Sequence, residues 1–252
     1  MLPVLQIGSL AIPVPGLALL AGVWVALWLV EKEAKRLEVN PDAVYTLAFI
    51  GLVAGLIGAR LAYVARYWSI YAGDLLGIFS LNTAGLSPAE GALIGATAAF
   101  IYGARKQLPL RVTLDALAPG VAMMAVAVAV AHLASGDAFG AATPAAFGGV
   151  PWGVYLWGEY RHPSQIYELI AALGVLGIGW QVRAQGLPAG AGFNFLLIVA
   201  LSAVARIFLE AFRGDSLVIA GGWRAAQVWG LVVLAACLGV MRYWGRENTQ
   251  GT

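Results

Sequence analysis

The chain has 252 residues, of which 61% are hydrophobic and 11% are charged, and its mean hydropathy is +0.81. A soluble domain is about 45–50% apolar and about 25% charged, so this composition excludes an ordinary soluble globular protein. The formal net charge of +2 gives no support to a nucleic-acid partner, and the single cysteine, Cys237, cannot form an internal disulfide. The composition therefore predicts an all-α, polytopic membrane protein.

Seven apolar segments reach or approach the roughly 20 residues that a helix needs to cross the hydrocarbon core of a bilayer. In chain order they are residues 13–30, 44–66, 90–104, 112–133, 164–182, 189–211 and 223–241. The third segment is short, and the fourth starts near Asp115 and Pro119. We expect a bundle of about seven transmembrane helices that forms a single transmembrane domain over residues 1–252.

The first apolar segment does not have the preceding positive charge of a cleavable signal peptide. No basic residue comes before it, whereas Lys32, Lys35 and Arg36 follow it. With the N-terminus outside, most of the Lys and Arg residues fall in cytoplasmic stretches, in agreement with the positive-inside rule. We therefore expect the N-terminus outside, the C-terminus in the cytoplasm, and the two longest loops, 67–89 and 134–163, outside.

Arginines occur inside two of the apolar runs. Arg60 lies within residues 47–63, and Arg206 lies within residues 193–212. Glu210 and Arg213 follow Arg206 at spacings of four and three, which predicts one shared helix face toward the outer end of the sixth span. A charge inside a membrane bundle is costly unless it faces a partner or a wet cavity, so each of these residues is a candidate functional residue.

A third polar cluster has the sequence Arg-His-Pro-Ser-Gln-Ile-Tyr-Glu, at residues 161–168. Pro163 suits the first position of a helix, which places His162 at or next to the cap. Gln165 and Glu168 are then one turn apart on one face, and the free N–H groups of the helix start favour an anion. Because arginine binds phosphate well, the three clusters together predict a site for an anionic ligand near the outer membrane surface.

Simpler interpretations of the same residues stay open. Arg206 and Glu210 could form a structural ion pair that holds the bundle together. His162 alone could be a polar helix cap, and Arg161 could extend to water at the interface. A small-solute transporter is disfavoured, because the sequence has no evident repeat and no matching pair of interrupted helices.

Two of these blocks resemble signature blocks of the bacterial prolipoprotein diacylglyceryl transferases. They are residues 161–168 and the sequence Arg-Ile-Phe-Leu-Glu-Ala-Phe-Arg-Gly-Asp at residues 206–215. Weaker resemblances occur at residues 55–63, which contain Arg60, at residues 115–119, at residues 136–140, which contain Asp137, and at Gln227. The resemblance spans most of the chain and implies seven helices with the N-terminus outside.

This family transfers the diacylglyceryl group of phosphatidylglycerol to the thiol of a lipobox cysteine in a preprolipoprotein, and glycerol phosphate leaves. The resemblance therefore implies a transferase of the bacterial plasma (inner) membrane that acts near the outer face on phosphatidylglycerol or another anionic phospholipid, with no metal and no cofactor. The expected catalytic residues are Arg206, Glu210, Glu90 and His162. The expected substrate-binding residues are Arg60, Arg161, Tyr167, Glu168, Arg213, His132 and Asp137.

The chain departs from the family pattern at several polar positions. The family has a histidine at the third helix where this chain has Glu90. By register from Gly136, an arginine and an asparagine of the family fall at Ala129 and His132, and a later asparagine falls at Ser135. Glu90 and His132 are the expected replacements for the missing base and cation. The alternative is a catalytically inactive or re-purposed paralogue that binds lipid or a membrane partner.

Overall fold

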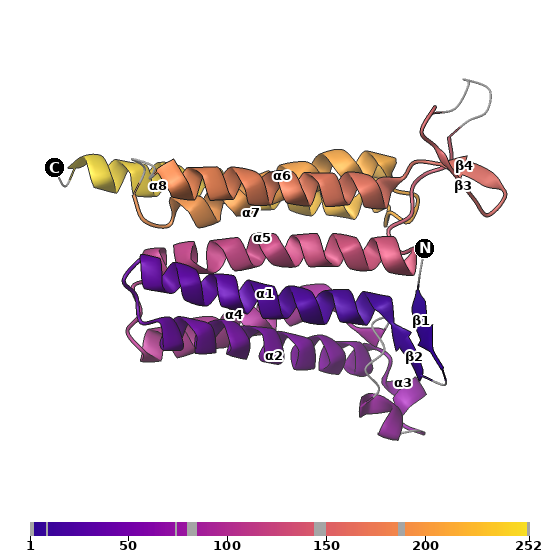
Figure 1. The fold of residues 1–252 in the computed structure, drawn as a ribbon, viewed down its shortest axis with the longest axis horizontal. Helices are drawn as coiled ribbons and strands as arrows, with labels where there is room; N and C mark the ends of the chain where they lie inside the picture. Colours follow the sequence, from indigo (N-terminus) through magenta and orange to yellow (C-terminus); the bar gives the residue numbers. More distant parts are fainter. Residues whose placement is uncertain are drawn as a thin grey trace. The chain divides into compact units, whose positions relative to one another are not determined.

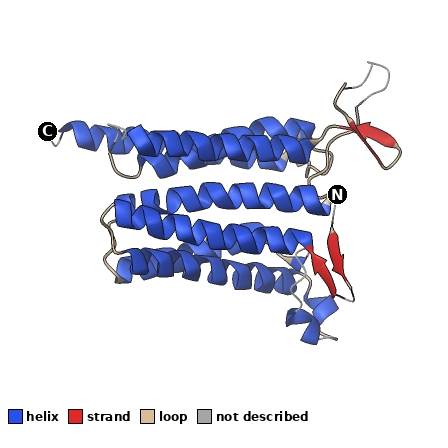
Figure 2. Cartoon of the chain, in the orientation of Figure 1, coloured by secondary structure: helices blue, strands red, loops and turns tan. Residues whose placement is uncertain are grey.

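The computed structural model describes residues 3–8, 10–73, 75–79, 85–143, 150–185 and 190–250. The helices of this part of the chain are α1 (Val14–Arg36), α2 (Pro41–Arg66), α3 (Trp68–Tyr71), α4 (Pro88–Arg105), α5 (Leu110–Ser135), α6 (Ser164–Gln185), α7 (Phe193–Leu209) and α8 (Ala225–Gln250) (Figure 1). A helix forms at each predicted apolar segment, and helix dominates the chain (Figure 2). The all-α prediction is therefore confirmed.

Six helices in the described ranges are long and apolar enough to cross a membrane: α1, α2, α5, α6, α7 and α8. The last turn of the α7 span is a 3-10 helix, η4 (Glu210–Phe212), so this apolar span covers Phe193–Phe212. The shortest predicted span corresponds to α4, which is not among the six. The protein is a multi-pass membrane protein.

The first long helix continues past its apolar segment because charged side chains pair along its surface. Lys35 Nζ lies 2.5 Å from Glu31 Oε1, and Arg36 Nη2 lies 2.6 Å from Glu33 Oε1. Pairs at spacings of three and four support a helix, so α1 extends beyond the predicted segment 13–30 to Arg36. The next helix, α2, starts at Pro41 and is capped by Asn40, whose side chain accepts a hydrogen bond from the Ala43 N–H at 3.1 Å.

Two small antiparallel hairpins were not predicted. They pair β1 (Val4–Ile7) with β2 (Leu10–Pro13) and β3 (Val154–Leu156) with β4 (Glu159–Arg161). The second hairpin turns through Trp157 and Gly158, which have φ angles of 52° and 83°. Positive φ at both central residues is the requirement of a type I′ turn, one of the tight two-residue hairpin turns. This turn shapes the segment that leads into α6.

The chain forms two compact units. Val30–Leu117 forms the α2/α4 unit, and Met1–Leu29 together with Ala118–Thr252 forms the α6/α7 unit. In the α2/α4 unit, a Cβ atom added to Gly55 would lie 3.2 Å from the Gly91 carbonyl oxygen. Glycines therefore let α2 and α4 pack backbone to backbone, as small residues do in membrane bundles. A single transmembrane domain over residues 1–252 stays a prediction.

In the α6/α7 unit, α7 packs against both α6 and α8, and Figure 1 shows α6 and α7 side by side. Ala118, Ala122, Val175 and Ile198 form one buried cluster of this unit. Leu196, Ala200 and Cys237 form a second cluster between α7 and α8. These contacts hold the first half of α7 against neighbouring helices, and the last turns of the same helix carry Arg206.

Candidate active site

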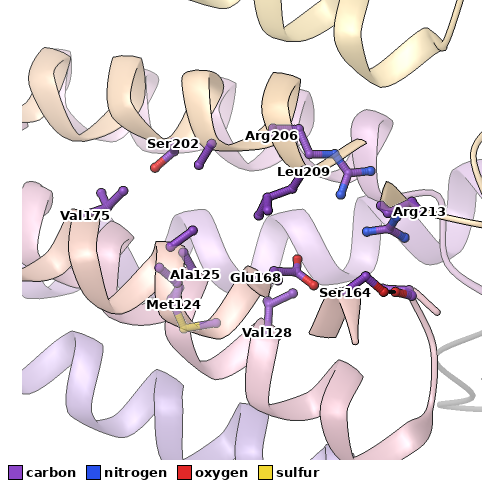
Figure 3. Close-up of a pocket in the computed structure, with 14 residues that line it drawn as sticks. Met124, Ala125, Val128, Ser164, Glu168, Val175, Ser202, Arg206, Leu209 and Arg213 are labelled. Carbon is purple, nitrogen blue, oxygen red and sulfur yellow. Dashed lines mark hydrogen bonds between the residues drawn. The ribbon is translucent and has the colours of Figure 1, made fainter. Parts of the chain in front are cut away.

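A cavity of about 290 Å³ lies between α5, α6 and α7 in the α6/α7 unit. Its lining residues are Met124, Ala125, Val128, Ala138, Ser164, Glu168, Ala171, Ala172, Val175, Ser202, Ala205, Arg206, Leu209 and Arg213. Figure 3 shows Arg206, Arg213 and Glu168 gathered at one end of the cavity, with Met124 and Val175 at the other. The cavity is therefore amphipathic, with charges at one end and an apolar remainder.

Helical spacing explains why these side chains share a cavity. On α6, the lining residues Ser164, Glu168 and Ala172 recur every four residues. On α7, Ser202 and Arg206 are also four apart. Residues three or four apart lie on one helix face, so one face of α6 and one face of α7 bring their polar side chains to the same cavity.

Arg206 is paired with Glu210 and also faces the cavity. Arg206 Nη2 lies 3.1 Å from Glu210 Oε2; the Arg206 side chain is 41% exposed and that of Glu210 is 2% exposed. The same Glu210 oxygen is buried and has no hydrogen-bond partner among the described residues, so the contact is an ion pair without good hydrogen-bond geometry. The pair holds Arg206 near Glu210 and leaves its side chain partly exposed in the lining of the cavity.

Arg213 is held by a bidentate contact with Asp215. Its Nε and Nη2 atoms donate to the two carboxylate oxygens at 2.9 and 2.8 Å. Partial burial alone would raise the pKa of Asp215, but the hydrogen bond and charge of Arg213 outweigh it and hold this pKa below its usual value. Two parallel hydrogen bonds fix the plane of the guanidinium at the cavity.

The prediction that Arg206, Glu210 and Arg213 share one helix face is wrong for Arg213. Regular α-helix ends at Leu209, and Arg213 is extended, with φ −82° and ψ 141°. Gly140 forms an isolated β-bridge with Arg213, and the Gly214 N–H donates to the Phe139 carbonyl at 2.8 Å. These contacts with a distant loop replace the helical hydrogen bonds.

The loop at residues 136–140 connects to the start of α6 as well. Ser164 Oγ donates to the Ala138 carbonyl at 2.6 Å, and Gln165 Nε2 donates to the Asp137 carbonyl at 3.2 Å. The Asp137 carboxylate is exposed and accepts a hydrogen bond from Ser135 Oγ at 2.8 Å. Three blocks that are far apart in the sequence, residues 136–140, 161–168 and 206–215, thus meet at one end of the unit.

His132 forms a close pair with Glu168. His132 Nδ1 lies 2.8 Å from Glu168 Oε2, and the two side chains are 27% and 24% exposed. The pair joins the end of α5 to a lining residue of the cavity. Ala129, which the sequence register matches to an arginine of the family, is fully buried and does not line the cavity, and that register match stays a prediction.

A second cavity of about 620 Å³ adjoins the first, with which it shares Ala171, Ala205 and Leu209. His162 and Tyr167 line this aromatic cavity and not the charged one. The remaining lining residues are Val150, Pro151, Trp152, Ile170, Phe208 and Phe212. This second cavity is almost entirely apolar, which suits hydrocarbon.

The polar groups of the aromatic cavity come from His162 and Tyr167. The His162 Nδ1 atom is buried without a hydrogen-bond partner among the described residues, and its ring contacts Phe212 edge to face. The Tyr167 hydroxyl accepts a hydrogen bond from Trp152 Nε1 at 2.5 Å. His162 is thus the one of these two residues that has a buried polar atom without a partner among the described residues.

The guanidinium of Arg161 is engaged by neighbouring residues of the protein. Its guanidinium donates to the Gly140 carbonyl at 3.2 Å and to Glu159 at 3.0 Å, and it lies 5.5 Å from the ring centres of both Phe139 and Trp157. Arg161 lines neither of the two cavities. Its position connects the β3–β4 hairpin with the 136–140 loop, and its substrate-binding role stays a prediction.

Arg60 belongs to the α2/α4 unit, where main-chain carbonyls occupy its guanidinium. Its Nε, Nη1 and Nη2 atoms donate to the carbonyls of Ile78, Gly85 and Gly77 at 2.9, 2.7 and 2.6 Å. The surrounding cavity of about 380 Å³ is otherwise lined by apolar side chains. These bonds give Arg60 a structural role, and substrate binding by Arg60 stays a prediction.

Glu90 lies in the first turn of α4 and pairs with Arg66 of α2. The Arg66 side chain is 59% exposed and that of Glu90 is 38% exposed. Glu90 is therefore already engaged with a cation within its own unit. Its role as a base stays a prediction.

Sequence reasoning did not identify Arg224. Its Nη1 atom donates to the main-chain oxygens of Glu210 and Arg213, the latter at 3.0 Å, and to Ser216 Oγ at 2.9 Å. Arg224 therefore holds together the turn that carries two of the predicted site residues. Arg224 directly precedes an apolar helix on the predicted outer side. The positive-inside rule does not explain an arginine there, and this was the signal in the sequence that could have identified it.

The fold and the site define a multi-pass membrane protein with an arginine-lined, amphipathic cavity. Within the described residues, no group of three or more His, Cys, Asp or Glu side chains is arranged to hold a metal ion. A family model described as prolipoprotein diacylglyceryl transferase matches residues 3–243. The chain therefore belongs to this family, and the resemblance inferred from its motifs is confirmed.

Relatives named phosphatidylglycerol–prolipoprotein diacylglyceryl transferase match over nearly their full length. The protein of Synechococcus elongatus is 29% identical, over 97% of this chain and 88% of the relative. The protein of Clostridioides difficile is 29% identical, over 92% and 91%. The protein of Streptococcus uberis is 30% identical, over 98% and 95%.

Proposed function

We propose that this protein transfers the diacylglyceryl group of phosphatidylglycerol to the thiol of a lipobox cysteine in a prolipoprotein. The observation that carries the proposal is the cavity that has Arg206 and Arg213 at one end and apolar side chains along the rest. A phospholipid has the matching distribution of a phosphate headgroup and hydrocarbon chains. The family membership and the printed names of the relatives support the same reaction.

The transfer forms a bond between the cysteine sulfur and the glyceryl carbon and breaks the bond from that carbon to the phosphate oxygen. Glycerol phosphate leaves with the electron pair of the broken bond. Arg206 binds the phosphate and stabilises the charge that develops on the leaving oxygen. Glu210 orients Arg206 through the ion pair, and Arg213, held by Asp215, adds positive potential at the same end.

The aromatic cavity next to the charged one suits the acyl chains or the apolar lipobox residues of the acceptor. Its lining residues are nearly all apolar, and three small or aliphatic residues separate it from the charged cavity. In this proposal His162 and Tyr167 contact the substrates at the apolar side, and Glu168 shapes the charged side. Asp137 acts at the rim, where its carboxylate is exposed.

We place the protein in the bacterial plasma (inner) membrane with its N-terminus outside and the site toward the outer face. The distribution of Lys and Arg supports this orientation. The lining of the cavity includes Ala138, which belongs to the predicted outer loop 134–163, and Ser164, which directly follows that loop and donates a hydrogen bond to the Ala138 carbonyl. A secreted acceptor would reach the thiol-transfer site from that side.

The proposal is tested by a transfer assay with the purified protein in nanodiscs. Phosphatidylglycerol and a lipobox peptide are supplied, and the thioether-linked product is measured by mass spectrometry. We expect product when phosphatidylglycerol is present. We expect none when the protein is assayed without phospholipid, and none with a peptide whose cysteine is replaced by serine. A folded protein that binds phosphatidylglycerol and yields no product would support the re-purposed paralogue instead.

A further inference from the structure

The position of His132 brings an imidazole to the charged end of the cavity. Val128 lines the cavity, and His132 follows it by four residues on the same face of α5. Glu168, which pairs with His132, is itself a lining residue. His132 therefore lies one turn beyond the lining of α5, at the end where the two arginines gather.

The pair also defines which nitrogen of His132 is available. An ionised carboxylate only accepts hydrogen bonds, so Nδ1 carries the proton that it shares with Glu168 at 2.8 Å. In the neutral imidazole, Nε2 then has the free lone pair. No hydrogen bond of this atom to another described residue is found, and the His132 side chain is 27% exposed. A carboxylate that orients an imidazole in this way is a common arrangement for general bases.

We propose that His132 is the proton acceptor for the cysteine thiol of the acceptor, and that Glu168 is the positioning residue that holds it in the active tautomer. This inference rests on the proposed transfer reaction and adds the group that activates its nucleophile. It assigns the base to the α6/α7 unit, which also holds the arginines that bind the leaving phosphate. Glu90, the rival candidate, is occupied by Arg66.

The step balances within the proposed reaction. Nε2 of His132 takes the thiol proton, and the sulfur becomes a thiolate, which is the nucleophilic form of cysteine. The thiolate attacks the glyceryl carbon, and the carbon–oxygen bond to phosphate breaks. The imidazolium then gives its proton to the departing glycerol phosphate or to water, which returns His132 to its neutral form. Neither an oxidant nor a metal is needed.

The test compares two acceptors that differ only in the reacting atom. One lipobox peptide carries cysteine and the other carries selenocysteine, whose selenol is largely ionised at neutral pH and needs no base. The variants are His132→Gln, which keeps a hydrogen-bond donor for Glu168, and Glu168→Gln, which removes the charge that orients the imidazole. Arg206→Ala provides a comparison that affects the leaving group, and its activity should fall with both peptides.

We expect His132→Gln to lower kcat for the cysteine peptide by about 10²-fold or more, in the range of a lost general base, with little change for the selenocysteine peptide. Glu168→Gln should show the same selectivity with a smaller loss. Equal losses with both peptides would give His132 a structural or binding role and overturn the proposal. A selective loss in Glu90→Gln, with His132→Gln unaffected, would assign the base to Glu90. A wild-type protein that modifies neither peptide would overturn the transfer reaction itself, and this inference with it.

Discussion

The guanidinium of Arg224 donates a hydrogen bond to the main-chain oxygen of Arg213 at 3.0 Å, and the same nitrogen reaches the main-chain oxygen of Glu210. One arginine at the start of α8 therefore determines the course of the turn that follows α7. The side chains of Glu210 and Arg213 depend on that turn for their positions at the charged end of the cavity.

We expect Arg224→Ala to reduce transfer by roughly 10- to 100-fold, because small displacements of positioning groups have effects of that size. The loss should appear mainly in kcat, with the protein still folded in detergent. Arg224→Lys, which keeps the charge and can still donate to these oxygens, should restore part of the activity. If Arg224→Ala had wild-type kinetics, the turn would not depend on this residue.

Replacement of Glu210 tests the ion pair with Arg206. Glu210→Gln preserves the size of a nearly completely buried side chain and removes its charge. Removing one partner of a fully buried ion pair costs about 3–5 kcal/mol, but Arg206 is 41% exposed, so we expect a loss of stability of only about 1 kcal/mol. Transfer should fall much more than stability, since Arg206 loses its orientation. Thermal unfolding and kinetics of the same preparation separate these two effects.

Arg60 provides the contrasting case, in which stability should change more than substrate binding. Arg60→Gln removes charged hydrogen bonds to three carbonyls that hold η1 (Leu75–Phe79) and Gly85 near α2, and such bonds contribute about 1.5–3 kcal/mol each. We expect a lower melting temperature and faster proteolysis, with KM for phosphatidylglycerol unchanged at a temperature where the variant is folded. A higher KM at unchanged melting temperature would instead support a substrate contact.

Acid should weaken the contact between Arg213 and Asp215. The folded-state pKa of Asp215 is lowered, so its stabilising contribution is complete above the unfolded pKa of about 3.9 and is lost as the pH falls through the lower folded value. Thermal unfolding should therefore show a loss of stability below about pH 4 in the wild type that is smaller in Asp215→Asn. At neutral pH, Asp215→Asn should already have the lower stability. Identical pH dependence in the two proteins would mean that the pair does not contribute.

The helices and the faces of the site were predictable because both depend on local spacing. Apolar runs of about 20 residues predict spans, and residues three or four apart share a face, which is why Arg206 and Glu210 are found together. The course of the chain after Leu209 was not predictable, because it depends on bridges to a loop some 70 residues earlier.

Other parts of the site required the structure for the same reason. The pairing of His132 with Glu168 joins residues from two helices, and no spacing rule applies between them. Arg60 shows why an arginine in an apolar run does not by itself indicate a ligand, since carbonyls of a nearby loop accept its hydrogen bonds and its predicted substrate-binding role stays a prediction. An intramembrane charge indicates that a partner exists, and only tertiary structure shows whether the partner is the chain or a ligand.

The central claim is that Arg206 binds and stabilises the leaving phosphate, and the most direct measurement compares transfer by wild type, Arg206→Ala and Arg183→Ala. Arg183 is a matched control, because it is an arginine of α6 that lies roughly 22 Å from Glu168 along the helix and packs over Trp180. We expect Arg206→Ala to lose about 10²- to 10³-fold in kcat, as for the loss of a group that stabilises a developing anion, and Arg183→Ala to retain activity. A folded Arg206→Ala protein that forms thioether product at the wild-type rate would contradict the account.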